Sequence, residues 1–311
     1  MKKLNLTNLE KSDVKYKITS YPDGQQDIII THFLMYNMPN SYKIEDAIAQ
    51  PVQIESRFNS FRDLELIICT VKALRRLKVK EIHLYIPYLL GSRSDRQFQN
   101  GGTSYLVDVV APIINSLNFE SVTVLDVHNP VMTAACINNL KLISNIYFVK
   151  ECLARKYDYD SNTGDNKCVL ISPDAGAFKK IFDIAKEIEF KGQIITASKN
   201  REISTGKILS TEVPMNPIDY YKDKDYIIID DICDGGRTFI ELAKVLKDLI
   251  GRKATINLIV THGIFSAGLK ELSEYFDHIY TTNSIMEINS STEFGMRNER
   301  YLNKVTQLNI F

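Results

Sequence analysis

The sequence predicts an α/β protein with two similar doubly wound domains, each built around a central parallel sheet. Strands of the buried type alternate with amphipathic helices in the first half of the chain, and the same alternation restarts in the second half. A hydrophilic stretch, 156–166, separates the halves and is typical of an exposed loop at a domain boundary. With 311 residues the chain is long enough for two domains. We expect domains at 1–150 and 151–289, with 290–311 packing back on the first.

The first half contains a βα pattern in which each helix has one apolar face. Its clearest helix covers Ser60 to Leu77, where apolar residues recur at helical spacing from Leu64 to Leu77. A Pro-Asp-Gly turn signal at 22–24 precedes the earliest strand. The other expected elements are strands at Asp27–Leu34, Glu81–Pro87 and Ser121–Val127 and a helix at Ser104–Leu117.

The second half repeats this pattern and adds one long polar segment. The segment Ala197 to Asn216 is rich in Lys, Arg, Ser, Thr and Gly, and loops of such length without structure of their own are usually functional or mobile. The expected strands are Lys167–Ile171, Gln193–Thr196, Tyr226–Ile229, Thr255–Thr261 and His278–Thr281, and the expected helices are Phe178–Ile188, Phe239–Leu249 and Ser266–Tyr275.

Composition excludes several classes of protein. Lys+Arg and Asp+Glu balance at 38 each, so the chain lacks the basic excess of a generic nucleic-acid binder. It has no apolar run of about 18 residues, and its first residues lack a signal-peptide core, so we expect a cytoplasmic protein that does not bind membranes. The five cysteines are scattered without a C-x-x-C pair, which supports neither disulfides nor a zinc site.

The strongest candidate site follows the strand that ends near residue 229. Asp230, Asp231 and Asp234 come at the strand end, and Gly235 and Gly236 lead into a helix. Ligands of open α/β sheets bind beyond the carboxyl ends of strands, and the N–H groups of a glycine turn before a helix suit a phosphate. The carboxylates would suit sugar hydroxyls or a metal. The alternative is an ordinary βα turn with solvated aspartates.

Two further loops beyond strand ends carry candidate ligand groups. Arg93 and Arg96 follow the strand at 81–87, and arginine forms planar, bidentate hydrogen bonds to phosphate; a solvated loop is the alternative. His128 follows the strand at 121–127 and is a candidate ligand or acid/base. The other four histidines are interpreted as structural.

Seven motifs in order make the chain resemble one family over nearly its whole length. The chain resembles the phosphoribosyl pyrophosphate synthetases (ribose-phosphate pyrophosphokinases) and looks like a divergent member of that family. The matching motifs are Tyr21-Pro-Asp23-Gly24-Gln25, Arg93-Ser94-Asp95-Arg96, Asp126-Val-His128, Ser172-Pro-Asp174-Ala-Gly176, Lys199-Asn-Arg201, the acidic loop Asp230 to Thr238, and the pair Thr261-His-Gly263 and Thr282-Asn-Ser-Ile285.

The resemblance implies a fold of the type I phosphoribosyltransferase kind and a transfer of the β,γ-diphosphate of Mg-ATP to the 1-hydroxyl of ribose 5-phosphate. It implies that Lys199, Arg201 and His128 are catalytic, and that His128 and Asp174 help to place Mg²⁺. ATP would bind Tyr21, Asp23, Gln25, Arg93, Ser94, Asp95 and Arg96. Ribose phosphate would bind Asp174, Asp230, Asp231, Asp234, Gly235, Gly236, Arg237 and Thr238. It also implies a homo-oligomer, either a dimer or a hexamer.

Several departures from the family pattern leave the acceptor open. Arg237 stands where the family usually has a small residue, and Asn129-Pro-Val-Met replaces the family segment after His128. These changes motivate a larger acceptor with a 5-phosphoribosyl end, such as ADP-ribose. Two other classes stay open as weaker alternatives: a phosphoribosyltransferase, which would not need the N-terminal half, and a non-catalytic regulatory subunit, against which Lys199 and Arg201 argue.

Overall fold

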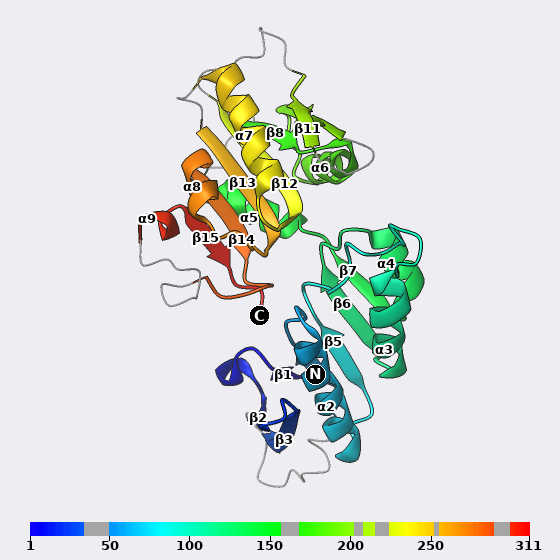
Figure 1. The fold of residues 1–311 in the computed structure, drawn as a ribbon. Coiled ribbons are helices and arrows are strands. Elements are labelled where there is room, and N and C mark those ends of the chain that lie inside the picture. Colours follow the sequence, from blue (N-terminus) through cyan, green and yellow to red (C-terminus); the bar gives the residue numbers. More distant parts are fainter. Residues whose placement is uncertain (34–49, 157–167, 202–207, 215–223, 252–254, 289–298) are drawn as a thin grey trace. The chain divides into compact units, whose positions relative to one another are not determined.

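A computed structural model describes residues 1–33, 50–156, 168–201, 208–214, 224–251, 255–288 and 299–311. These residues form two compact units (Figure 1). The first comprises Met1–Ser144 together with Phe311, and the second comprises Asn145–Ile310. Each unit contains a parallel sheet, which confirms the predicted α/β class.

The first unit is built on a five-stranded sheet in which all neighbouring strands are parallel. Its order is β1 (Lys2–Asn5), β4 (Val52–Glu55), β5 (Ile82–Tyr85), β6 (Ser121–Leu125) and β7 (Leu140–Ile143). The helices are α2 (Phe61–Arg76), α3 (Ala111–Ser116) and α4 (Pro130–Cys136), with a π-helical segment, Tyr105–Val110, before α3. One core cluster joins sheet and helices, and it includes Phe58, Leu64 and Ile82.

Helix α2 shows how the sequence sets an element's limits. Ser60 caps its first turn in a reciprocal capping box with Asp63, and Leu77 ends it. The apolar positions at helical spacing, among them Leu64, Ile67 and Leu74, are buried. The expected helix at 60–77 therefore agrees with the structure to within its two capping residues.

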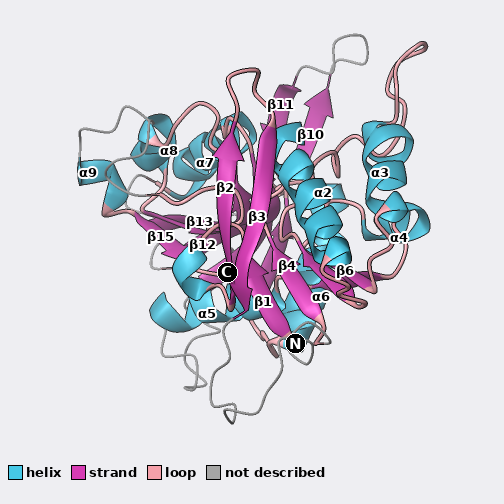
Figure 2. Ribbon diagram, turned by 90° about the horizontal axis from the view of Figure 1, so that it is seen from below, coloured by secondary structure: helices cyan, strands magenta, loops and turns pink. Residues whose placement is uncertain are grey.

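A two-stranded hairpin lies beside α2 (Figure 2). It consists of β2 (Val14–Ser20) and β3 (Gln26–Phe33), which pair in antiparallel fashion. The backbone N–H of Gln26 donates to Glu65 Oε1 and its side-chain amide donates to the Arg62 carbonyl, so the start of β3 is fixed to α2.

The second unit is built on a six-stranded parallel sheet whose strand order reverses once. The order is β15 (Val305–Leu308), β14 (His278–Thr282), β13 (Thr255–Gly263), β12 (Asp225–Cys233), β8 (Cys168–Ser172) and β9 (Gln193–Thr196). From β8 the chain moves outward to β9, and it returns to β12 on the other side of β8. The reversal places a topological switch point between β8 and β12, which is where open α/β sheets bind ligands.

Helices cover both faces of this sheet, as a doubly wound fold requires (Figure 1). Alternate residues of the buried strands point to opposite faces. Tyr226 and Ile228 pack with α7 (Arg237–Ile250) and α8 (Lys270–Tyr275). Ile227 and Ile229 pack with α5 (Ile146–Lys156) and α6 (Ala175–Glu187). None of the helices in the described part of the chain combines the length and apolar character that a membrane span requires.

Two expectations for the second half are corrected. Part of the polar segment 197–216 forms its own antiparallel pair, β10 (Ser198–Arg201) with β11 (Ile208–Glu212). Residues 305–308, expected to belong with the first domain, form β15, which pairs with β14 in the second sheet. Backbone hydrogen bonding to a parallel neighbour fixes this short edge strand, and of the described residues in 290–311 only Phe311 groups with the first unit.

Candidate functional site

Two adjacent carboxylates lie at the carboxyl end of β12, beside the switch point. The strand continues through Asp230 and Asp231 to Cys233, further than the expected end at Ile229. Asp231 is 5% exposed and Asp230 is partly buried. Burial and the neighbouring Asp231 carboxylate raise the pKa of Asp230 well above its ordinary value. Burying two adjacent carboxylates costs hydration free energy, and the aspartates of an ordinary solvated turn would not have this cost.

The turn after β12 presents a row of backbone donors. Within the described ranges, four consecutive backbone N–H groups have no hydrogen-bond acceptor, namely those of Gly235, Gly236, Arg237 and Thr238. Gly236 is the N-cap of α7, and its carbonyl accepts from the N–H groups of Phe239 and Ile240. Consecutive donors at the N-terminus of a helix suit an anion, and the helix dipole adds to the attraction. This turn can hold a phosphate.

Gly236 gives the turn its shape. Its φ is +79°, in the left-handed region, and a Cβ atom there would lie 2.9 to 3.1 Å from the side chain of Leu272 on α8. The backbone conformation and the close packing against α8 both require glycine. The phosphate turn is therefore held in one conformation by a neighbouring helix.

We expect Gly236→Ala to lower the free energy of unfolding by about 1–3 kcal/mol, because it adds left-handed strain and a collision with Leu272. Gly251→Ala is the matched control: Gly251 also has positive φ, at +87°, but nothing lies within 4 Å of its added Cβ. Urea denaturation of both variants measures the difference. If both variants lost the same free energy of unfolding, the contact between residue 236 and Leu272 would not contribute to the effect of Gly236→Ala.

Asp174 lies on the other side of the switch point, after β8. It is the N-cap of α6, and its Oδ1 accepts from the N–H groups of Gly176 and Ala177 at 3.0 and 3.1 Å. The helix therefore begins at Ala175, earlier than the expected Phe178, because the aspartate cap fixes its start. Since β8 and β12 are adjacent in the sheet, Asp174 and the carboxylate pair share one edge.

Lys199 and Arg201 lie on β10, which directly follows β9 in the chain. Strand β9 is the edge strand of the second sheet and pairs with β8. The backbone register places Lys199 opposite Thr211 and Arg201 opposite Ile208 on β11. The register of the hairpin is irregular between Asn200 and Arg201.

In the first unit, the loops after β5 and β6 are joined. The loop after β5 carries Arg93 and Arg96, which are exposed, and Asp95, which is buried. Asn129 donates through Nδ2 to Asp95 Oδ2. Asn129 also caps α4, directly after the exposed His128. Because β5 and β6 are neighbours, this bond holds the arginine loop and the histidine loop at one edge of the sheet.

The turn Tyr21 to Gln25 closes the β2–β3 hairpin. The N–H of Tyr21 donates to the Gln25 carbonyl at 2.8 Å, and the N–H of Gln25 donates to Asp23 Oδ1. Gly24 has a φ of +94°. Tyr21 is 45% exposed, so a large aromatic face stands open at the tip of the hairpin.

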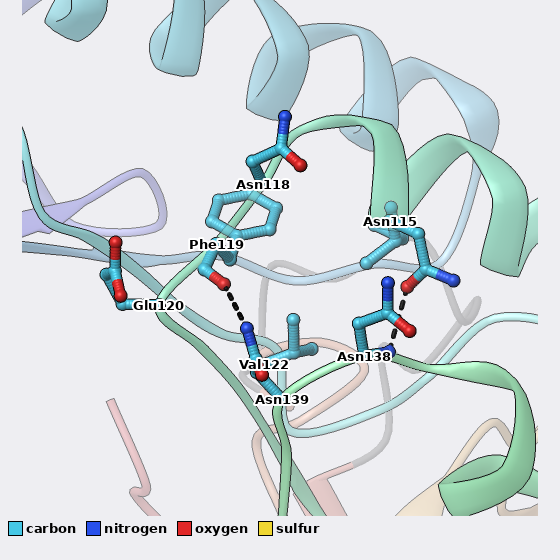
Figure 3. Close-up of a pocket in the computed structure, with 8 residues that line it drawn as sticks. Asn115, Asn118, Phe119, Glu120, Val122, Asn138 and Asn139 are labelled. Carbon is cyan, nitrogen blue, oxygen red and sulfur yellow. Dashed lines mark hydrogen bonds between the residues drawn. The ribbon is translucent and has the colours of Figure 1, made fainter.

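One pocket of the first unit lies away from these loops (Figure 3). It encloses about 170 Å³ and is lined by residues that include Asn115, Glu120 and Asn138. Glu120 precedes β6 and Asn139 precedes β7, so the pocket is at the amino edge of the sheet. Asn139 donates to the Phe119 carbonyl, and the N–H of Asn138 donates to Asn115 Oδ1 (Figure 3). These amides fix turns, and the pocket is not part of the candidate site.

The predicted site residues thus divide between the two units. The first unit holds Tyr21, Asp23, Gln25, Arg93, Ser94, Asp95, Arg96 and His128. The second holds Asp174, Lys199, Arg201, Asp230, Asp231, Asp234, Gly235, Gly236, Arg237 and Thr238. Within the second unit the switch point brings Asp174 and the 230–238 stretch to one sheet edge.

Comparisons with known proteins find similarity over most of the chain. A model of the phosphoribosyl transferase domain matches residues 138–285. A ribose-phosphate pyrophosphokinase of Pyrococcus abyssi is 24% identical over 285 residues, covering 90% of this chain and 85% of its own. One from Thermococcus kodakarensis is 28% identical over 215 residues, 68% of this chain and 70% of its own. The crystal structure of a phosphoribosylpyrophosphate synthetase from Mycobacterium smegmatis has a TM-score of 0.73 at 16% identity, covering 97% of this chain and 88% of that one.

The chain is similar to the ribose-phosphate pyrophosphokinases, as a distant relative at 24–28% identity, and residues 138–285 match the phosphoribosyl transferase domain. The fold expected for this family is confirmed by the structural match.

Two residues that contact the candidate site were missed by the sequence reasoning. Lys180 on α6 forms an ion pair with Asp231, and Ser266 after β13 donates through Oγ to Asp234 Oδ1 at 2.6 Å. A lysine on a helix is usually interpreted as part of a solvated face. Ser266 was placed at the start of a helix, whereas α8 begins at Lys270.

Proposed function

We propose that the protein transfers the β,γ-diphosphate of Mg-ATP to the anomeric hydroxyl of ribose 5-phosphate, releasing AMP. The observation that carries the proposal is the carboxylate pair near the end of β12 followed closely by four consecutive backbone donors at the start of α7. A sugar phosphate carries the complementary groups, which are adjacent hydroxyls and a dianion. The names of the relatives support the reaction.

On this proposal each group of the second unit has one task. Asp230 and Asp231 accept hydrogen bonds from the ribose hydroxyls, and charged acceptors make these bonds strong. The N–H groups of residues 235–238 and the Thr238 hydroxyl hold the 5-phosphate. Binding at both ends fixes the anomeric hydroxyl in one position, and such positioning supplies much of the catalysis in phosphoryl transfer.

The first unit supplies the proposed ATP-binding groups. Arg93 and Arg96 bind the phosphates, and the link between Asp95 and Asn129 holds their loop in place. The exposed ring of Tyr21 stacks on adenine, while Asp23 and Gln25 offer polar contacts to the base.

The residues present suit Mg²⁺ on the side of the carboxylates. This ion commonly binds through one or two carboxylates, waters and substrate phosphates, and Asp174 offers a carboxylate at the edge shared with Asp230 and Asp231. When bound, Mg²⁺ neutralises charge on the phosphates of ATP. His128, in the first unit, would also help to place Mg²⁺.

The transfer step uses the two basic residues of β10. The anomeric oxygen forms a bond to the β-phosphorus of ATP and passes its proton to water, while the bond from the β-phosphorus to the oxygen bridging the α-phosphate breaks. AMP leaves with that electron pair. Lys199 and Arg201 stabilise the negative charge that develops on the transferring group.

Incubation with Mg-ATP and ribose 5-phosphate tests the proposal. We expect release of AMP that depends on the acceptor, together with a new diphosphate ester in the ³¹P NMR spectrum. Ribose without the phosphate is the control acceptor and should be at least a hundredfold poorer. Absence of AMP with ribose 5-phosphate would exclude this acceptor.

One observation favours ADP-ribose as a second candidate acceptor. Arg237 is exposed at the first residue of α7, beside the proposed phosphate site, and it adds a positive charge where the family usually has a small residue. A second phosphate on the acceptor would have a partner there. If so, Arg237→Gly should lower kcat/KM for ADP-ribose about tenfold or more and change that for ribose 5-phosphate less than threefold, corresponding to the loss of about one charged contact. Parallel AMP assays with both acceptors measure the ratio, and an unchanged ratio would exclude the role.

A further inference from the structure

Lys180 contacts the carboxylate pair from a helix that the reaction scheme does not otherwise use. Its Nζ atom lies 3.7 Å from Asp231 Oδ2. The Lys180 side chain is 26% exposed and that of Asp231 is 7% exposed, so the ion pair is largely shielded from water. An ion pair in such surroundings is screened less than one on an open surface.

The fold explains why this lysine reaches this aspartate. Ile227 and Ile229 point to the face covered by α5 and α6, and Asp231 continues that alternation two residues further along β12. Helix α6 starts directly after β8, the parallel neighbour of β12, so its first turns lie near the same sheet edge. Ile181 packs into the core, and Lys180 stands at the flank of that buried face.

The ion pair meets a need created by the two carboxylates. Adjacent carboxylates at a shielded position repel each other, and burial disfavours their charged forms. A sugar hydroxyl is bound best by a carboxylate that is charged and fixed in direction. An ammonium group beside Asp231 favours its charged form and restricts its rotation.

We propose that Lys180 is a positioning residue for the acceptor, which acts by holding Asp231 charged and oriented toward the ribose hydroxyls. This inference rests on the proposed function. It assigns to α6 a part in acceptor recognition that is separate from ATP binding.

The test compares four proteins: wild type, Lys180→Met, Lys180→Arg and Lys179→Met. Methionine keeps most of the side-chain volume and removes the charge, and arginine restores the charge. Lys179 is the exposed neighbour on the same helix and serves as the matched control. The readouts are the KM for ribose 5-phosphate, the KM for ATP, kcat, and calorimetric binding of ribose 5-phosphate and of ADP-ribose. Lys180→Gln replaces Lys180→Met if the latter does not fold.

In Lys180→Met we expect the KM for the acceptor to rise at least tenfold, with the KM for ATP and kcat changed less than threefold. The acceptor KM of Lys180→Arg should stay within threefold of the wild-type value. The acceptor KM of Lys179→Met should equal the wild-type value. An unchanged acceptor KM in the neutral variant, or equal rises for acceptor and ATP, would overturn the role of Lys180 alone. If the wild type binds neither acceptor and releases no AMP, the proposed function fails and the inference fails with it.

Discussion

Replacing Arg201 by alanine is expected to lower kcat by about a thousandfold or more, while the Kd for ATP changes less than about threefold. A group that stabilises charge present only in the transition state contributes to turnover and little to ground-state binding. Rapid-quench measurement of AMP formation, combined with calorimetric titration of ATP, separates the two quantities.

Arg62→Ala serves as the control for this variant, since Arg62 is an exposed arginine on α2 in the other unit. We expect it to have wild-type kcat and ATP affinity. If Arg201→Ala lost ATP binding and turnover by the same factor, Arg201 would be a ground-state ligand of ATP, and its proposed transition-state role would be wrong.

Replacing Asp230 by asparagine should have opposite effects on activity and stability. We expect kcat/KM for the acceptor to fall about a hundredfold or more, because a charged acceptor of the ribose hydroxyls is lost. At neutral pH we expect the free energy of unfolding to rise, because the variant removes a carboxylate whose ionisation is disfavoured by burial and by Asp231. Asparagine Oδ1 can still accept from the N–H of Asp231.

The pH dependence has a definite sign. The pKa of Asp230 is raised in the folded protein, so between the unfolded and folded values the folded state binds more protons and stability falls as pH rises. Below both values the wild type and Asp230→Asn should therefore be equally stable, and the stability gain of the variant should appear as pH rises. In the wild-type profile of kcat/KM against pH, the midpoint of the acidic limb should lie at a pH well above the pKa of an ordinary aspartate. Asp248→Asn, on the exposed side of α7, should show neither effect. A variant less stable than wild type at neutral pH would contradict the argument.

The sequence predicts the long elements of the fold well. Strands such as β12 and β13 are continuous apolar runs, and helices such as α2 and α7 have a clear apolar stripe, so periodicity identifies them. Four-residue strands are a mixed case, because β9 was predicted with its exact bounds whereas others of the same length were not. Edge strands β1, β7 and β15 are too short to show a period, and pairing with a neighbouring strand fixes them.

The candidate site was predictable where its residues lie in turns at strand ends. Asp174 and the 230–238 stretch follow buried strands, and the strand order then shows that they share an edge. Lys180 was not predictable in this way, because its partner is 51 positions away and only the packing of α6 on the sheet brings the two together. The hairpin of β10 and β11 was missed because its polar residues carry no alternating apolar pattern.

The alternation along β12 has a consequence for how acceptor preference can change. Asp231 forms an ion pair with Lys180 on α6, and Asp230 occupies the alternate position of the strand just before it. Substitutions on α6 can therefore tune one carboxylate without disturbing the helix that begins at the phosphate turn. On the proposed function, recognition of the sugar and recognition of the phosphate would then depend on different helices.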